Sequence, residues 1–468
     1  MKDVFTSILN QASEKPGDQN GEWKIFSPSN TDEFLGKCVY RYAEIDLSVM
    51  GAQVAASSLG ALSLDDRFSL VKRGMEIILR AKKDLLATAS KELGRAEHDL
   101  EEEWSRLEVF FAAFASENFS DCKNDEPRGI TAVIGSYVWP IFYSLHFAFL
   151  NLLAGNSVII KPSEKASLTV LKIFETLRNN CSEMTAVQVL IGDKEVGRRL
   201  ACHEAISTII FQGSFEVGVR VKQDTLSQPG KQVLLYLGAK NPAIIFKDSP
   251  VSVYETLIRD AFQGTGQDCK SVSVAFVENS FLSEFVDRFH QLCKEFKIGA
   301  PGSGAFTGPL IDGAMLDRYL KFVGISEREG ARIVMRGKPL PAAGKGHYVT
   351  PTLALFERLT PEQMRKSVSL QTEILAPHLS IVGFDGEDSL GPVLHQIIHG
   401  RNVSIWTGDG ERSRRLAQTL DFGSIAINQS LLKFNSWQTF QARKRSGNHA
   451  YLGRGLLSQL SHPKVIQS

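Results

Sequence analysis

The segment ITAVIGSYVWPIFYSLHFAFLNLLAGNSVIIK, residues 130–161, decides the fold class. Before its final lysine it contains no aspartate, glutamate, lysine or arginine, and it is long enough to span a bilayer. Glycine, proline and asparagine nevertheless divide it into a strand (Ile130–Ile134), a helix (about Ile141–Leu153) and a second strand (Val158–Ile160). Parallel strands covered on both faces have this continuous apolar character. The segment therefore predicts a buried β-α-β unit rather than a membrane span.

Further short strands alternate with helical segments after this unit. Each is rich in β-branched residues: Val187–Ile191, Thr208–Phe211, Gln232–Leu237, Ala243–Phe246 and Ser271–Val277. Such alternation predicts an α/β protein with largely parallel sheets and right-handed crossovers.

The N-terminal part of the chain has weaker signals. Strands are expected around Trp23–Phe26 and Cys38–Tyr42. A long helical run from Arg67 to Leu93 starts after S-L-D-D and stops at Gly94. The next stretch, E-H-D-L-E-E-E-W (97–104), is charged and helical, so we expect it to form a solvated helix face.

Composition excludes several function classes. The 468 residues are enough for roughly two or three domains, and 43% hydrophobic with 22% charged residues is typical of a soluble globular protein. A net charge of +1 gives no sign of nucleic-acid or acidic-membrane partners. The six cysteines form no C-x-x-C pair and no Cys/His cluster, which argues against disulfides and a metal site. The polar first twenty residues do not form a signal peptide, so a cytoplasmic location is expected.

A cysteine follows two glycines in F-Q-G-T-G-Q-D-C, residues 262–269. Gly264 and Gly266 let the backbone bend sharply and approach a ligand closely. Helix-forming residues precede this stretch and a β-branched run follows it, so Cys269 is expected at a bend between helix and strand. A nucleophile can be held exposed at such a bend. A buried structural cysteine is the commoner fate of a free thiol, and this window alone leaves both interpretations open.

A phosphate-binding turn is the second candidate. In F-Q-G-S-F-E-V-G-V-R-V (Phe211–Val221) a strand runs into Gly213–Ser214 and a helix begins just after. Free N–H groups and the helix dipole favour an anion there, although a plain serine N-cap explains the same residues. Upstream, Lys161 and Glu164 follow a buried strand, where ligands bind in open α/β sheets. The lysine suits ribose hydroxyls and the acid disfavours a 2′-phosphate, but a surface lysine and a helix start fit equally well.

Five motifs occur in one order along the chain. They are G-N-S-V-I-I-K-P-S-E (155–164), F-Q-G-S-F-E-V-G (211–218), L-Y-L-G-A-K-N-P (235–242), F-Q-G-T-G-Q-D-C (262–269) and E-I-L-A-P (373–377). Weaker similarities are T-G-P-L-I (307–311), Y-V-T-P-T-L (348–353), G-S-I-A-I-N (423–428) and S-G-N-H (446–449). Over roughly residues 20–460 the chain resembles the aldehyde dehydrogenase superfamily. The S-G-N-H ending is most similar to the semialdehyde branch that includes succinylglutamate semialdehyde dehydrogenase.

The resemblance implies an architecture. It consists of a Rossmann-type nucleotide-binding domain (1–108 and 128–237), an α/β catalytic domain (238–430) and a small β bridging element for oligomerisation (109–127 and 431–468). It also implies NAD as cofactor, with NADP left open, a small-molecule aldehyde as substrate, and a homodimer or homotetramer.

The resemblance also implies site residues, carried over by position. Cys269 matches the nucleophile that forms a thiohemiacetal with the aldehyde. The cofactor-binding positions are Lys161, Ser163 and Glu164 at the adenosine ribose motif, Gly213, Ser214 and Gly218 at the pyrophosphate motif, and Glu373 at the nicotinamide ribose.

Three departures from the family pattern concern the chemistry. Tyr236 stands where the family has a glutamate that activates water, and a tyrosine with a pKa of about 10 does not replace a carboxylate base at neutral pH. Val138 stands where the family has an oxyanion-binding asparagine, and a valine side chain donates no hydrogen bond. After Phe440, Q-A and three basic residues replace the expected glycine pair.

These departures leave three functions open. The first is an NAD(P)-dependent aldehyde or semialdehyde oxidoreductase whose deacylation is impaired or rerouted. The second is a coenzyme A-acylating aldehyde dehydrogenase, which needs no water-activating glutamate; G-A-K-N resembles the methylmalonate semialdehyde branch of this kind. The third is a catalytically degenerate binding protein with the same fold.

Overall fold

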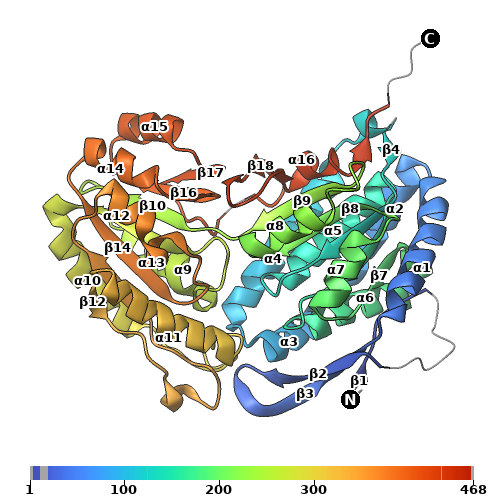
Figure 1. Ribbon diagram of the computed structural model, residues 1–468, viewed down its shortest axis with the longest axis horizontal. Helices are drawn as coiled ribbons and strands as arrows, with labels where there is room; N and C mark the ends of the chain where they lie inside the picture. Colours follow the sequence, from blue (N-terminus) through green and yellow to red (C-terminus); the bar gives the residue numbers. More distant parts are fainter. Residues whose placement is uncertain (1–3, 11–18, 124, 434, 465–468) are drawn as a thin grey trace.

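The computed structural model describes residues 4–10, 19–123, 125–433 and 435–464. Figure 1 shows two lobes, each built on a mainly parallel sheet with helices packed around it. One lobe holds a five-stranded sheet and the other a seven-stranded sheet. The α/β class with largely parallel sheets, predicted from the alternating strands and helices, is confirmed.

The five-stranded sheet contains the β-α-β unit. Its order is β7-β6-β5-β8-β9, and every pair is parallel. The strands are β5 (Ile130–Ile134), β6 (Ser157–Lys161), β7 (Val187–Val189), β8 (Ile206–Gly213) and β9 (Gln232–Leu237). The helices are α5 (Pro140–Ala154), α6 (Ser167–Asn180), α7 (Lys194–Cys202) and α8 (Phe215–Asp224). Helix α5 is buried along its whole length, as the predicted β-α-β unit requires. In the described part of the chain no helix is long and apolar enough to cross a membrane.

The seven-stranded sheet has the order β12-β13-β14-β11-β10-β16-β17. Its one antiparallel pair among the described residues is β12 with β13. The strands are β10 (Asn241–Ile245), β11 (Val272–Glu278), β12 (Arg332–Met335), β13 (Thr352–Phe356), β14 (His378–Phe384), β16 (Asn402–Trp406) and β17 (Ser424–Ile427). The helices are α9 (Val253–Phe262), α10 (Leu282–Glu295), α11 (Gly313–Arg328), α12 (Pro361–Lys366), α13 (Val368–Gln371), α14 (Glu387–Leu394) and α15 (Gly410–Thr419).

A three-stranded sheet of order β1-β3-β2 and four helices form the N-terminal region. They are β1 (Val4–Phe5), β2 (Gly21–Ser27), β3 (Asn30–Tyr40), α1 (Ala43–Gly60), α2 (Leu64–Arg80), α3 (Lys82–Leu93) and α4 (Glu97–Ser116). The helical run predicted up to Leu93 is two helices, because the backbone at Ala81 leaves the helical region (φ −89°, ψ 4°). The predicted ends are confirmed: the Ser63 hydroxyl accepts from the Asp66 N–H, and Gly94 is left-handed with φ 65°.

Small β elements join the end of the chain to both lobes. The pairs are β4 (Glu126–Pro127) with β21 (Ser461–His462), β15 (His399–Gly400) with β19 (Arg443–Lys444), and β18 (Phe440–Gln441) with β20 (Ala450–Tyr451). The short helix α16 (Gly453–Leu457) precedes β21. Single 3₁₀ turns are η1 (Ser120–Cys122), η2 (Ser182–Ala186), η3 (Gln263–Gly266), η4 (Asn279–Phe281) and η5 (Pro341–Ala343). Helix α4 runs through the limit predicted at residue 108, and the domain limits stay a prediction.

The expectation for the charged stretch 97–104 is wrong on one face of α4. Asp99 and Glu103 are buried there. A Glu103 carboxylate oxygen accepts from the Ile141 and Phe142 N–H groups at 2.8 and 3.0 Å, and so satisfies the first amides of α5. A carboxylate is also favoured at the positive end of a helix. Glu103 therefore anchors the helix that follows the first strand of the β-α-β unit.

Candidate active site

Cys269 lies between α9 and β11, as predicted. After α9 the backbone passes through η3, where Gly264, Thr265 and Gly266 have φ values of 60°, 59° and 64°. A Cβ atom at Gly266 would collide with the carbonyl oxygen of Ala376, so no larger residue fits. This bend leaves Cys269 half-buried with a free thiol.

Side chains from distant motifs hold the cysteine turn. The Asn241 amide donates to the carbonyl oxygens of Cys269 and Ser271 at 2.9 and 3.1 Å. The side-chain oxygen of Gln267 accepts from the Ile311 N–H at 3.0 Å. The Asp99 carboxylate accepts from the Gly264 N–H at 3.1 Å. Asn241 and Asp99 are positioning residues that sequence reasoning missed, although Asn241 lies within the L-Y-L-G-A-K-N-P motif.

One cavity of about 670 Å³ brings together most of the predicted site. Cys269, Ser163, Gly213, Ser214 and Glu373 all line it. They come from the cysteine turn, the segment after β6, the β8–α8 junction and the segment before β14. The carboxyl ends of β6 and β8 thus meet the nucleophile, which is where open α/β sheets bind ligands.

The β8–α8 junction has the geometry of an anion site. Ser214 is the N-cap of α8, and its hydroxyl accepts from the Val217 N–H at 3.4 Å. The N–H groups of the first turn face outward with the positive end of the helix dipole. A Cβ atom at Gly218 would lie 2.5 Å from Leu237 Cδ2, so this glycine lets α8 pack against β9. Gly218 therefore acts through packing and lies outside the cavity wall.

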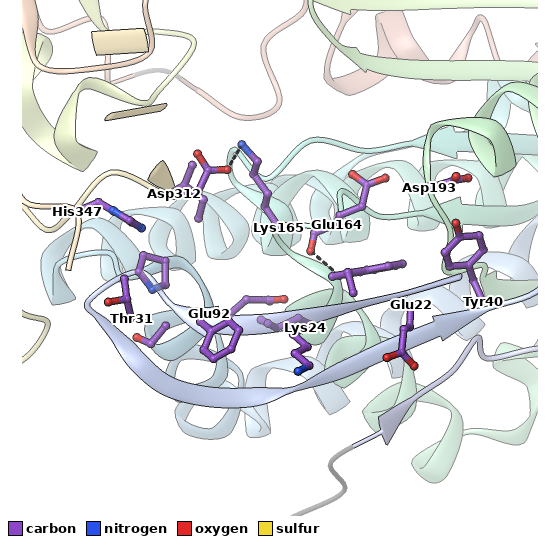
Figure 2. Close-up of a pocket in the computed structure, with 16 residues that line it drawn as sticks. Glu22, Lys24, Thr31, Tyr40, Glu92, Glu164, Lys165, Asp193, Asp312 and His347 are labelled. Carbon is purple, nitrogen blue, oxygen red and sulfur yellow. Dashed lines mark hydrogen bonds and ion pairs between the residues drawn. The ribbon is translucent and has the colours of Figure 1, made fainter. Parts of the chain in front are cut away.

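Lys161 and Glu164 form an ion pair beside this cavity. The Lys161 ammonium is buried and donates to the Glu164 carboxylate at 3.0 Å. Glu164 lines a different cavity, of about 540 Å³, under the β2–β3 hairpin. Figure 2 shows this second cavity, in which the Trp23 indole N–H donates to the Glu164 carbonyl at 3.2 Å and Lys165 pairs with Asp312 at 2.6 Å. The predicted ribose motif thus lies between two cavities.

Glu373 is held by the backbone of the L-G-A-K motif. Its carboxylate accepts from the Ala239 N–H at 3.0 Å, and Gly238 leaves room for it because a Cβ atom there would strike the carboxylate. Burial raises the pKa of Glu373 to about 7, against the opposing effects of the Ala239 N–H and of the Arg401 and Arg318 charges. This carboxyl group therefore changes its charge near neutral pH.

Tyr236 occupies the place of the family's glutamate and lies in an aromatic cluster. Its ring centroid is 4.2 Å from that of Tyr451 and 4.3 Å from that of His449. The S-G-N-H segment lies along the same strand, since the Asn448 side chain bonds the backbone of Leu235 and Val233. The Tyr236 hydroxyl is buried without a hydrogen bond of normal geometry, and burial raises its pKa well above 10. A phenol in this state is no general base.

Burial is the largest influence on the protonation of the Cys269 thiol. Burial raises the pKa of Cys269 to about 11, and the positive charge of Arg401 is the strongest opposing influence. Arg401, which also lines the cavity, lies outside every motif found in the sequence analysis. Among the described residues, no group of three or more histidine, cysteine, aspartate or glutamate side chains has the arrangement to hold a metal ion.

Comparisons with known proteins agree with this geometry. The profile of the aldehyde dehydrogenase family matches residues 16–466. Chloroplastic betaine aldehyde dehydrogenase of Amaranthus hypochondriacus is 27% identical over 489 residues, with 96% of this chain and 95% of the relative covered. Alpha-ketoglutaric semialdehyde dehydrogenase of Bacillus subtilis (strain 168) is 24% identical over 461 residues, with 92% and 93% covered.

Solved structures share the fold. An aldehyde dehydrogenase from Bartonella henselae matches with a TM-score of 0.89 and 22% identity, covering 98% of both chains. Betaine aldehyde dehydrogenase from Staphylococcus aureus in complex with NAD+ matches with a TM-score of 0.88 and 19% identity, covering 97% of this chain and 93% of the other. The family match spans both lobes and the cavity with its cysteine. The chain belongs to the aldehyde dehydrogenase family.

Proposed function

We propose that this protein oxidises an aldehyde or semialdehyde to the acid with NAD, through a thiohemiacetal and a thioester on Cys269, and that the thioester is released slowly. The observation that carries the proposal is the single cavity of about 670 Å³ that joins Cys269 to Gly213, Ser214 and Glu373. A nucleophile, an anion site and a ribose-binding carboxylate are thereby accessible to one extended ligand.

The residues present fit a dinucleotide. The α8 N-terminus at Ser214 would bind the pyrophosphate and Glu373 would accept from ribose hydroxyls. Exposed Arg445 and half-buried Arg318 add positive charge along the same wall. Glu164 beside Lys161 disfavours a 2′-phosphate, which favours NAD over NADP. NAD bound there would supply the hydride acceptor that converts a thiohemiacetal into a thioester.

The residues at the reacting end support slow deacylation. The Cys269 sulfur adds to the aldehyde carbon, and the carbonyl oxygen takes the negative charge. Release of the acid then requires an activated water. Tyr236 has no ionisable proton near neutral pH, and loss of a general base typically costs about 10²–10⁴ on the step it serves. Oxidation of the thiohemiacetal to the thioester should therefore be faster than hydrolysis of the thioester.

Rapid mixing with NAD and a panel of aldehydes tests the proposal. We expect a burst of NADH of one equivalent per Cys269, followed by a much slower steady rate. Cys269→Ala should abolish the burst, whereas Cys202→Ala, which changes a free cysteine outside the cavity, should keep it. No burst with any aldehyde, despite measurable NAD binding, would contradict the proposal.

A degenerate binding protein is the second candidate function. The observation that favours it is the loss of both chemical groups, since Val138 and Tyr236 line the cavity in place of an amide and a carboxylate. NAD binding without a burst would support it. Repeating the burst assay with coenzyme A addresses the acylating alternative, because only an acylating enzyme would show an accelerated steady rate.

A further inference from the structure

Arg401 is a buried charge without an acidic partner. It lies between β15 and β16 and lines the cavity together with Cys269. Arg401 is only 3% exposed to solvent. Among the described residues, Asp268 and Glu373 act on its charge only from beyond ion-pair distance, and its Nε has no hydrogen-bond partner. Since a buried charge without a directly paired opposite charge is unfavourable, an anion that forms or binds in the cavity is the expected partner.

Two tyrosines hold the guanidinium in place. An Arg401 Nη2 donates to the Tyr143 hydroxyl at 3.2 Å, and the guanidinium carbon lies 5.1 Å from the ring centroid of Tyr451. Because the Tyr143 oxygen accepts this bond, its own proton remains available to another acceptor. Tyr143 also lines the cavity. The pair therefore presents an N–H and an O–H donor to the same space.

Besides the carboxylates of Glu216 and Glu373, Cys269 is the group of this cavity that becomes negatively charged in the proposed reaction. The ionisable groups that act on its sulfur come from several elements: Asp268 and Lys270 of its own turn, Arg401 between β15 and β16, Tyr143 of α5, Tyr451 of β20 and Glu373 before β14. Burial raises the pKa of this thiol, and the Arg401 charge opposes burial more than the Lys270 charge does. Val138 offers no side-chain donor.

We infer that the Arg401 charge stabilises the thiolate of Cys269, and that Arg401 and the Tyr143 hydroxyl together then stabilise the negative charge on the substrate oxygen. The thiol proton leaves to solvent, the S–C bond forms, and the C=O π pair moves to the oxygen, where these donors act without the further help of a side-chain amide at residue 138. The oxyanion part rests on the proposed function. The thiolate part holds for the protein without aldehyde or cofactor.

Alkylation of the full-length protein with iodoacetamide tests the thiolate part. The rate at Cys269, followed by peptide mass, is measured between pH 6 and 10. Arg401→Gln should lower this rate about tenfold near pH 8, because loss of a neighbouring cation raises a thiol pKa by about one unit. Arg401→Lys should recover most of it. Arg443→Gln, an exposed arginine paired with Asp421, is the matched control and should match the wild type.

Single-turnover NADH formation tests the oxyanion part. Arg401→Gln should slow the burst by about 10²-fold, the usual effect of losing an oxyanion donor. Tyr143→Phe keeps the cation, so it should slow the burst while leaving alkylation within about twofold; melting temperatures identify any misfolded variant. Equal alkylation in Arg401→Gln and the wild type would overturn the inference. If Arg401→Gln lost the burst only with aldehydes that carry a carboxylate, Arg401 would bind the substrate rather than the oxyanion. That result would also overturn the inference. Arg401-dependent alkylation without any burst supports the thiolate assignment and contradicts the proposed function alone.

Discussion

The two ends of the 670 Å³ cavity differ in what they retain. At the proposed cofactor end, Gly213, Ser214 and Glu373 stand at the positions that the family resemblance assigns to the cofactor; Ser214 caps α8, and Glu373 accepts from the Ala239 N–H. At the reacting end, Cys269 is retained, but Val138 and Tyr236 replace the groups that serve it. The proposed binding positions thus keep the residue types expected from the resemblance, whereas Val138 and Tyr236 depart from them.

This difference shows that positioning and activation are separable in this fold. The cysteine turn is held by Asn241, Gln267 and Asp99 with ordinary hydrogen bonds, so the nucleophile is well positioned. Its pKa is nevertheless raised to about 11 by burial. The cysteine is thus well positioned while burial works against its ionisation, and this is the effect that Arg401 is proposed to oppose.

The largest predicted effect comes from restoring an amide at the reacting end. Val138→Asn should raise the burst rate constant by about 10²-fold, since one oxyanion donor is typically worth 10²–10³ in rate. Val138→Ile, which adds bulk without a donor, is the matched control and should stay within about twofold of the wild type. The measurement is stopped-flow NADH fluorescence at saturating aldehyde. Equal rates for the two variants would mean that the ends of the cavity do not differ in the way argued above.

Local sequence predicted the scaffold well because its strands are buried on both faces. Gln232–Leu237 was predicted as a strand and is β9, and the bend at Cys269 follows from Gly264 and Gly266. The break at Ala81 was missed because Ala-Lys-Lys carries no helix-breaking residue. Asp99 and Glu103 were taken for a solvated face because periodicity does not distinguish an exposed carboxylate from a buried one that binds backbone N–H groups.

The position of Arg401 in the cavity could not be predicted from the local sequence. Its neighbours in the sequence, Gly400 and Asn402, carry no motif, and its functional neighbours Cys269 and Tyr143 are more than a hundred residues away. The pairing of β10 with β16 and β11 brings the segments of Arg401 and Cys269 together, and α5 of the other lobe supplies Tyr143. The five collinear motifs contain about half of the residues that line the cavity, but a residue such as Arg401, which lies between two strands and outside any motif, has no local signature.

An intermediate effect is predicted at the cofactor end from the pKa of Glu373. This pKa is raised to about 7, so the carboxyl group is mostly neutral at pH 6 and mostly ionised at pH 8. An ionised carboxylate is the stronger acceptor for ribose hydroxyls. The affinity for NAD should therefore rise about tenfold from pH 6 to pH 8, in proportion to the ionised fraction.

Calorimetric titration with NAD across this pH range is the measurement. Glu373→Gln should bind weakly and with little pH dependence. Glu216→Gln, which changes an exposed carboxylate on the same cavity wall, should keep the tenfold rise. A pH dependence that survives in Glu373→Gln would assign the titration to another group, and the cofactor end would lose its ribose carboxylate.

The smallest effect is predicted for Tyr236→Phe. Burial raises the pKa of Tyr236 well above 10, and its hydroxyl lacks a hydrogen bond of normal geometry, so removing that hydroxyl takes away no base. The steady rate should stay within about twofold of the wild type. The free energy of unfolding in urea should rise by roughly 1 kcal/mol, because a buried polar group without a partner is unfavourable. The ring contacts with Tyr451 and His449 remain in phenylalanine. A tenfold fall in the steady rate at unchanged burst amplitude would instead make the phenol part of deacylation, and the reacting end would then hold a substituted base rather than a missing one.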